Sequence, residues 1–198
     1  MSTAPLSLPD GAAVRAWFSF RSPYSYLGMH KALKAGIPLQ LVATWPEGEV
    51  ASTSTPRRMT YLIEDCTRLF EEEGLPFAPP VDVEKWVRPH GAFYAAAQQG
   101  KGEAFLMRAY QARWSESKDL GDPATIAELA EEVGVDPQAA AAAMDDPAIH
   151  KELLAKQKEF AQDEPVGVPF FVYEGQRFWG QDRVEALCRH IAKIHGRG

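Results

Sequence analysis

The sequence has no asparagine and only two cysteines, Cys66 and Cys188, which lie far apart among its 198 residues. This spacing excludes a CxxC pair and a cysteine-based zinc site, and two cysteines are too few for a disulfide framework. No run of about 18 apolar residues is present, so we expect no membrane span. Residues 1–11 lack the basic and apolar regions of a signal peptide. We therefore expect a reducing, cytoplasmic environment.

Positive charge is also scarce. The formal net charge is −6, and the pair Arg57-Arg58 is the longest cluster of basic residues. A nucleic-acid-binding face needs a basic patch, so nucleic acid is excluded as a partner. The five histidines show no metal-ligand spacing, so we expect no metal. Hydrophobic residues make up 45% and charged residues 24%, which is typical of a folded globular protein.

The chain begins with a strand–helix–strand pattern. Residues 14–20 alternate between apolar and other side chains, which predicts a half-buried strand. Ser22 is a good N-cap residue and Pro23 suits the first position of a helix, which we expect to end near Gly36. The apolar residues 39–45 predict a second strand, so an α/β fold is indicated.

The middle of the chain, residues 56–162, is predicted to be entirely helical. Apolar spacing predicts a helix over residues 59–70 and one or two helices over 92–114, and helices are expected to open at Pro123, Pro137 and Pro147. The end returns to strands, with a hairpin of residues 169–173 and 176–179 and a final helix starting at Asp182. We predict a thioredoxin-like domain of residues 12–55 and 163–198 that carries a helical insertion domain of residues 56–162.

In a fold with the order β-α-β and then β-β-α, the chemistry lies at the N-terminus of the first helix. Free N–H groups and the helix dipole favour an anion there. A redox enzyme places two cysteines at this point, whereas this chain has Ser22 and Ser25. Dithiol chemistry is thereby excluded at this position. A serine hydroxyl still donates a hydrogen bond to a thiolate that arrives with a ligand.

Two segments carry a resemblance to a known family. Residues 18–27, FSFRSPYSYL, resemble the opening motif of the 2-hydroxychromene-2-carboxylate isomerases, and residues 166–172 and 178–183, VGVPFFV and FWGQDR, resemble their second motif. With the kappa-class glutathione transferases, these isomerases form part of the DsbA-like branch of the thioredoxin fold. The resemblance covers the chain from about Val14 to Leu187.

This resemblance implies glutathione as the bound cofactor. Ser22 matches the catalytic serine that faces the glutathione sulfur, and Val168, before a cis Pro169, matches the residue whose backbone pairs with the cysteinyl part. Gln181 and Asp182 match the residues that hold the γ-glutamyl end, with Asp182 also beginning the last helix. The implied reaction is reversible addition of the thiolate to an unsaturated aromatic 2-oxo acid, with rotation and elimination. Relatives are usually homodimers.

The chain departs from the family in the loop after the second strand, where relatives have an asparagine near the cofactor. Here residues 52–55 are Ser-Thr-Ser-Thr, so a hydroxyl of Thr53 or Ser54 is the alternative contact. Candidate contacts to an aromatic, anionic substrate are Tyr24, Trp45, Arg57 and Arg58. Two other readings stay open: a kappa-type transferase or peroxidase acting on other electrophiles, and a non-catalytic thioredoxin-fold binding module.

Overall fold

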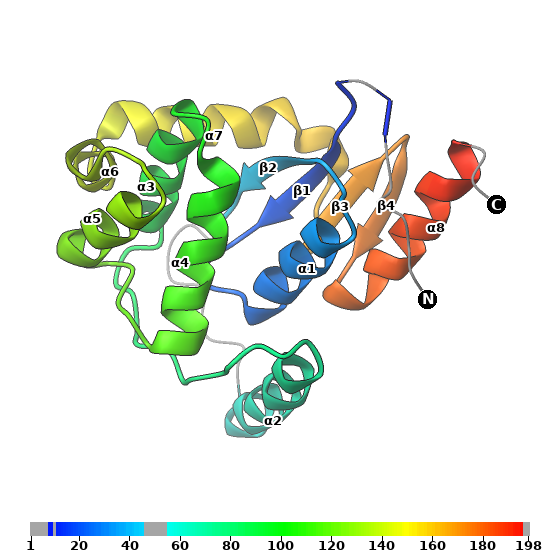
Figure 1. Ribbon diagram of the computed structural model, residues 1–198, viewed down its shortest axis with the longest axis horizontal. Helices are drawn as coiled ribbons and strands as arrows, with labels where there is room; N and C mark the ends of the chain where they lie inside the picture. Colours follow the sequence, from blue (N-terminus) through cyan, green and yellow to red (C-terminus); the bar gives the residue numbers. More distant parts are fainter. Residues whose placement is uncertain (1–7, 10, 46–54, 196–198) are drawn as a thin grey trace. The chain divides into compact units, whose positions relative to one another are not determined.

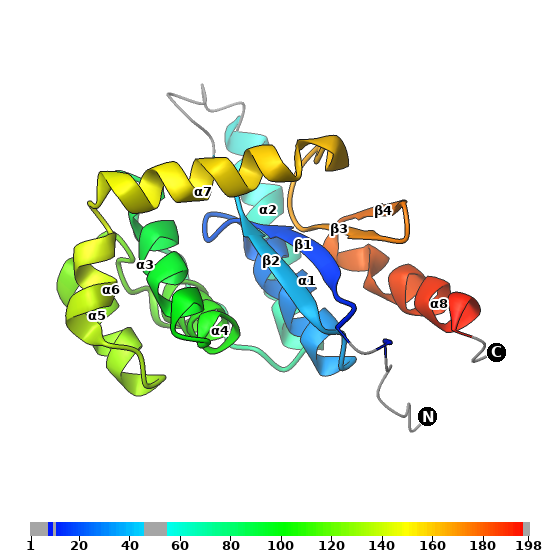
Figure 2. The same ribbon diagram turned by 90° about the horizontal axis from the view of Figure 1, so that it is seen from above.

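Four strands form a mixed sheet in the order β2-β1-β3-β4 (Figure 1). In the computed structural model, which describes residues 8–9, 11–45 and 55–195, β1 pairs in parallel with β2, and β3 runs antiparallel to both β1 and β4. Helices α1 and α8 lie on the same face of this sheet (Figures 1 and 2). The strands are Val14–Phe18 (β1), Leu39–Ala43 (β2), Phe170–Tyr173 (β3) and Gln176–Trp179 (β4), and the helices are Pro23–Lys34 (α1) and Val184–Ile194 (α8).

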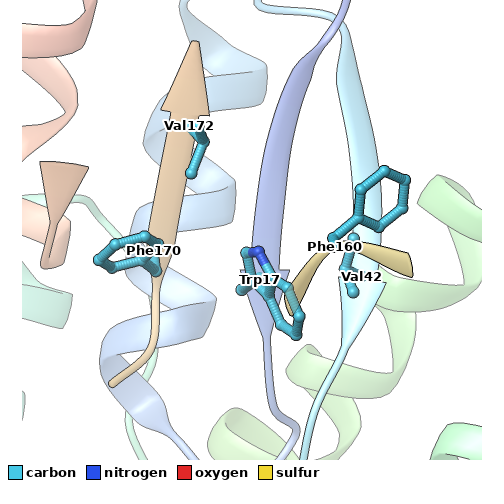
Figure 3. Close-up of a cluster of buried hydrophobic side chains, with 5 residues drawn as sticks. All are labelled: Trp17, Val42, Phe160, Phe170 and Val172. Atoms are coloured by element: carbon cyan, nitrogen blue, oxygen red, sulfur yellow. The ribbon is translucent and has the colours of Figure 1, made fainter. Parts of the chain in front are cut away.

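The opposite face of the sheet carries a small hydrophobic cluster. Because successive side chains of a strand point to opposite faces, Phe170 and Val172 of β3 share this face. They pack with Trp17 of β1, Val42 of β2 and Phe160, which follows the helix Pro147–Glu159 (α7) (Figure 3). Both faces of the predicted half-buried first strand are therefore covered over most of its length.

A buried carboxylate ties the entry into β3 to the first strand. Asp163, which ends the short 3-10 helix Ala161–Asp163 (η1), accepts hydrogen bonds from the Arg15 guanidinium at 2.9 and 2.7 Å and from Trp17 Nε1 at 2.8 Å. Burial acts to raise the pKa of Asp163, but the hydrogen bonds from Arg15 and Trp17 outweigh it and lower the pKa below its usual value. Asp163 is therefore ionised and fully partnered in the folded protein.

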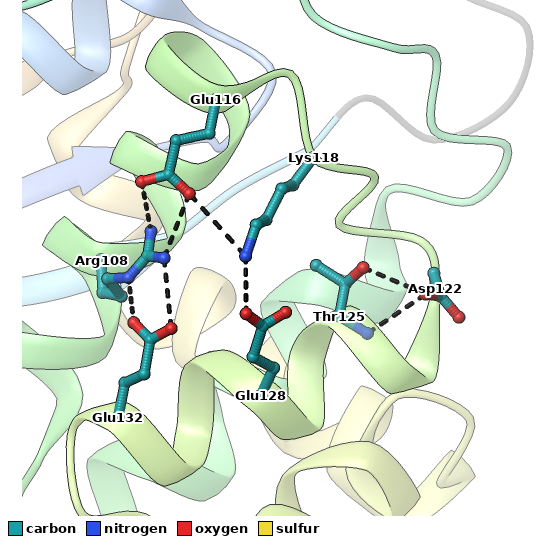
Figure 4. Close-up of polar contacts among 7 residues, drawn as sticks. All are labelled: Arg108, Glu116, Lys118, Asp122, Thr125, Glu128 and Glu132. Carbon is teal, nitrogen blue, oxygen red and sulfur yellow. Dashed lines mark hydrogen bonds and ion pairs between the residues drawn. The ribbon is translucent and has the colours of Figure 1, made fainter.

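Helices make up the middle of the chain, and none of its described residues, from position 55 to 155, lies in a strand. Helices α3, α4, α5 and α6 pack against one another (Figure 2). Arg108 bonds to Glu116 and Glu132 and thereby links α4 to α5 (Figure 4). The bounds are Pro56–Glu72 (α2), Val87–Gln98 (α3), Gly102–Glu116 (α4), Pro123–Glu132 (α5), Pro137–Ala143 (α6) and Pro147–Glu159 (α7).

The predicted fold class is confirmed, as is the order of its elements. The described chain divides into two compact units, one built from residues up to Ala43 and from Lys156 onward, the other from Thr44–Ala155. The boundaries between these units, after Ala43 and after Ala155, lie earlier in the chain than the domain boundaries expected at residues 55 and 162. The expected domain boundaries stay a prediction. Within the described residues, no helix combines the length and the apolar character needed to cross a membrane.

Replacing Asp163 by asparagine should lower the free energy of unfolding by about 2–3 kcal/mol at neutral pH, because the part-buried Arg15 loses its anionic partner. Since folding lowers the pKa of Asp163, this stabilisation is fully present above about pH 4 and is lost as the pH falls through the folded-state value. Urea unfolding across this pH range measures both effects.

The control is Glu159→Gln, which removes an exposed ion pair with Lys156 and should change the free energy of unfolding by less than about 0.5 kcal/mol. Equal losses in the two variants, or an Asp163→Asn loss that does not shrink below about pH 4, would contradict this account.

Candidate functional site

The N-terminus of α1 is capped as the sequence predicts. Ser22 has an extended backbone, its Oγ accepts a hydrogen bond from the Ser25 N–H at 3.1 Å, and Pro23 occupies the first helical turn. The first turn carries no acidic residue. The positive end of the helix dipole is therefore not neutralised from within its own helix, which favours an anion near Ser22.

The Ser22 hydroxyl also faces the segment before β3. Its Oγ donates to the Val168 carbonyl at an O···O distance of 3.5 Å, which is long for a hydroxyl hydrogen bond. The Val168–Pro169 peptide bond is cis, which confirms that expectation. Because the Val168 carbonyl is a distant acceptor, the hydroxyl proton of Ser22 is available to a closer and more basic one.

Gly28 allows α1 to approach Pro169. A Cβ at position 28 would lie 2.6 Å from Cγ of Pro169 and 3.4 Å from the ring of Phe171. Position 28 of α1 therefore requires glycine for its packing, and this packing sets the separation of Ser22 and Val168. The role of Gly28 is not evident from the sequence alone, because a glycine within a helix has several explanations.

Gln181 and Asp182 lie in a 3-10 turn, Gln181–Arg183 (η2), that precedes α8. The expectation that Asp182 begins the last helix is wrong. Helix α8 begins at Val184, its N-cap is Arg183, and no side chain caps it. Gly180, at a φ of 110°, makes the turn possible, and its N–H donates to the Pro169 carbonyl at 3.0 Å.

The two side chains of this turn have different partners. The Asp182 carboxylate is exposed and pairs with Arg183 at 2.7 Å. Gln181 is half-buried, and its Oε1 accepts a hydrogen bond from Lys31 Nζ of α1 at 2.5 Å. The contact of Lys31 is not evident from the sequence alone, because no motif includes Lys31 and its partner is 150 positions away.

The chain is similar to known proteins in both its sequence and its fold. A family model described as the DSBA-like thioredoxin domain matches residues 13–192. The chain belongs to this DsbA-like family. It is also 26% identical over 187 residues to a 2-hydroxychromene-2-carboxylate isomerase from Sphingobium xenophagum, a match that covers 88% of this chain and 95% of that protein.

Solved structures share the DsbA-like fold. A 2-hydroxychromene-2-carboxylate isomerase matches with a TM-score of 0.80 and 20% identity, covering 92% of this chain and 96% of that one. A probable DsbA oxidoreductase from Streptomyces coelicolor matches with a TM-score of 0.75 and 21% identity over 94% and 91%. The cytosolic disulfide reductase DsbM from Pseudomonas aeruginosa, in a structure with GSH, has a TM-score of 0.63 and 18% identity over 92% and 100%.

Neither cysteine of this DsbA-like chain is at the start of α1. Cys66 is buried on α2 and Cys188 is partly buried on α8, and both are free thiols. Burial raises the pKa of Cys66 to about 12 and also raises that of Cys188. Both are therefore protonated at neutral pH and are poor nucleophiles.

The predicted substrate contacts are distributed between the two compact units. Tyr24 is half-buried in the first turn of α1, near Ser22 in sequence, whereas Arg57 and Arg58 are exposed in the first turn of α2. Trp45 lies against the His90 ring, with centroids 5.3 Å apart. A substrate role for these residues stays a prediction, and Ser52, Thr53 and Ser54 lie outside the described residues.

His90 lies in the first turn of α3. It is fully buried, and its Nδ1 lies 2.5 Å from the Trp86 carbonyl. Burial lowers the pKa of His90 to about 4, so the ring is neutral at pH 7 and Nδ1 carries the proton. Among the described residues, no group of three or more histidine, cysteine or acidic side chains is placed to hold a metal ion.

Substituting Gly28 by alanine tests the close packing of α1 on Pro169. Alanine is favoured over glycine within a helix by about 1 kcal/mol, yet we expect Gly28→Ala to lower the free energy of unfolding by about 1–2 kcal/mol. The reason is the 2.6 Å approach of the new methyl group to Pro169. Denaturant unfolding measures the change, and a variant more stable than the wild type would refute the packing argument.

Proposed function

We propose that the protein is a glutathione-dependent isomerase of aromatic 2-oxo acids of the 2-hydroxychromene-2-carboxylate type. The observation that carries the proposal is Ser22, a capping serine at the start of α1 whose hydroxyl, among the described residues, donates only to the distant Val168 carbonyl. The identity of 26% to an isomerase over most of both chains supports the choice of reaction.

The residues of the first unit fit a γ-glutamyl tripeptide. At one end, the Ser22 hydroxyl and the positive end of the α1 helix dipole suit a thiolate. Next to it, the Val168 N–H donates to no backbone carbonyl within the described residues, so it suits pairing with a peptide. At the other end, the Asp182 carboxylate suits an ammonium and the Gln181 amide suits a carboxylate.

When bound, glutathione supplies a sulfur nucleophile that adds reversibly to a carbon–carbon double bond. Ser22 donates its hydrogen bond to the sulfur and thereby favours the ionised form. Lowering a thiol pKa by about 2 units corresponds to ~2.7 kcal/mol, which a charge-assisted hydrogen bond and a helix N-terminus together supply. Val168 pairs with the cysteinyl part and Asp182 holds the γ-glutamyl end, so that the sulfur stays in front of Ser22.

The remaining assignments concern the substrate. Tyr24 is proposed to stack on the aromatic ring, and Trp45 is a second aromatic candidate. Arg57 and Arg58 are proposed to attract the carboxylate of the substrate, since both are exposed at the start of α2. We also propose a homodimer in the cytoplasm, where the free thiols of Cys66 and Cys188 would persist.

The test combines binding and turnover. Glutathione at 100 times its dissociation constant should stabilise the wild type by about 2.7 kcal/mol and raise its melting midpoint by a few degrees. Ser22→Ala should lower kcat for chromene isomerisation about 100-fold, because it removes the donor to the sulfur. Ser22→Thr, which keeps a hydroxyl, should retain most of the activity.

Loss of the cap alone costs about 1 kcal/mol of stability, and Thr55→Ala at the N-cap of α2 is the matched control for that effect. Full turnover by Ser22→Ala would refute the role of Ser22. Turnover of 1-chloro-2,4-dinitrobenzene or peroxides in place of the chromene would indicate a kappa-type transferase or peroxidase. No binding of glutathione at millimolar concentration would indicate a non-catalytic module.

A further inference from the structure

Lys31 connects the helix that carries Ser22 to the turn that carries Asp182. It lies in the last turn of α1, and its Nζ donates to Gln181 Oε1 at 2.5 Å. Both side chains are half-buried, and η2 packs directly against α1. The contact is therefore between two ordered elements of the same compact unit and not between two mobile surface side chains.

This contact fixes the orientation of the Gln181 amide. A primary amide has an oxygen that only accepts hydrogen bonds and a nitrogen that only donates them. A lysine ammonium has donors and no acceptor, so it binds the amide oxygen and not the nitrogen. The amide nitrogen is then turned away from Lys31 with its two N–H donors.

The turn consequently has two groups of opposite character next to each other. Gln181 offers N–H donors, which suit a carboxylate, while the adjacent Asp182 carboxylate suits an ammonium. An α-amino acid group, such as the γ-glutamyl end of glutathione, carries both partners on one carbon. If the Gln181 amide were reversed, its oxygen would face the ligand carboxylate and repel it.

We propose that Lys31 is a positioning residue that holds the Gln181 amide with its N–H donors toward the ligand and so selects the α-carboxylate of the γ-glutamyl group. The proposal rests on the proposed function, because it assumes that glutathione occupies this unit. It adds a residue of α1 to a subsite otherwise built from η2. Lys31 therefore acts on affinity for one particular group of the ligand.

The test uses calorimetric titration with three tripeptides: glutathione, an analogue without the α-carboxylate and an analogue without the α-amino group. Lys31→Met should lower the affinity for glutathione and for the analogue without the amino group by about tenfold. It should leave the affinity for the analogue without the carboxylate unchanged. Lys31→Arg, which also has donors only, should restore most of the affinity, and Lys34→Met on the same helix is the control for loss of charge.

A double-variant cycle distinguishes positioning from simple charge attraction. If Lys31 acts through Gln181, Lys31→Met should have no further effect in a Gln181→Ala background, whereas independent attraction would make the two losses multiply. If Lys31→Met lowers the affinity for all three tripeptides equally, or if the affinity losses of the two variants multiply, the positioning role of Lys31 is overturned. Binding of glutathione by the wild type would still stand in that case. No binding of glutathione by the wild type overturns the proposed function and this proposal together.

Discussion

The close approach of α1 to the segment that enters β3 is the constraint on which the candidate site depends. It requires the absence of a side chain at Gly28, where a Cβ would meet Pro169 at 2.6 Å. The same segment receives the Ser22 hydroxyl at Val168 and the Gly180 N–H at the Pro169 carbonyl. The start of the β3–β4 hairpin thus contacts both the distant helix α1 and the turn after β4 at Val168 and Pro169.

Three charged features of this unit differ in their partners and roles. The charge of Asp163 is neutralised by Arg15. This ion pair stabilises the fold and is not part of the candidate site. At the start of α1 the helix dipole is left without an acidic side chain, which suits a bound anion. On η2, Asp182 and the Lys31–Gln181 contact supply opposite polarities.

Local chemistry made much of the fold predictable. Ser22 and Pro23 predict the start of α1 because a cap and its first turn depend on neighbouring residues, and β4 has the predicted bounds of residues 176–179. The prediction that the last helix starts at Asp182 is wrong, because Gly180 and its hydrogen bond to the Pro169 carbonyl favour a 3-10 turn at Asp182. Such a turn depends on a tertiary contact, which a local pattern does not contain. The hydrogen bond between Lys31 and Gln181 is likewise a tertiary contact, so the local sequence pattern does not predict it.

The central claim is that the start of α1, with Ser22, stabilises a thiolate brought by a ligand. The most direct test is a pH titration of the ultraviolet thiolate absorbance of glutathione bound to the wild-type protein. We expect the thiol pKa to lie about 2 units below that of free glutathione, and the value in Ser22→Ala to lie between the two, because only the helix N-terminus remains. A bound thiol that titrates at the same pH as free glutathione would contradict the account.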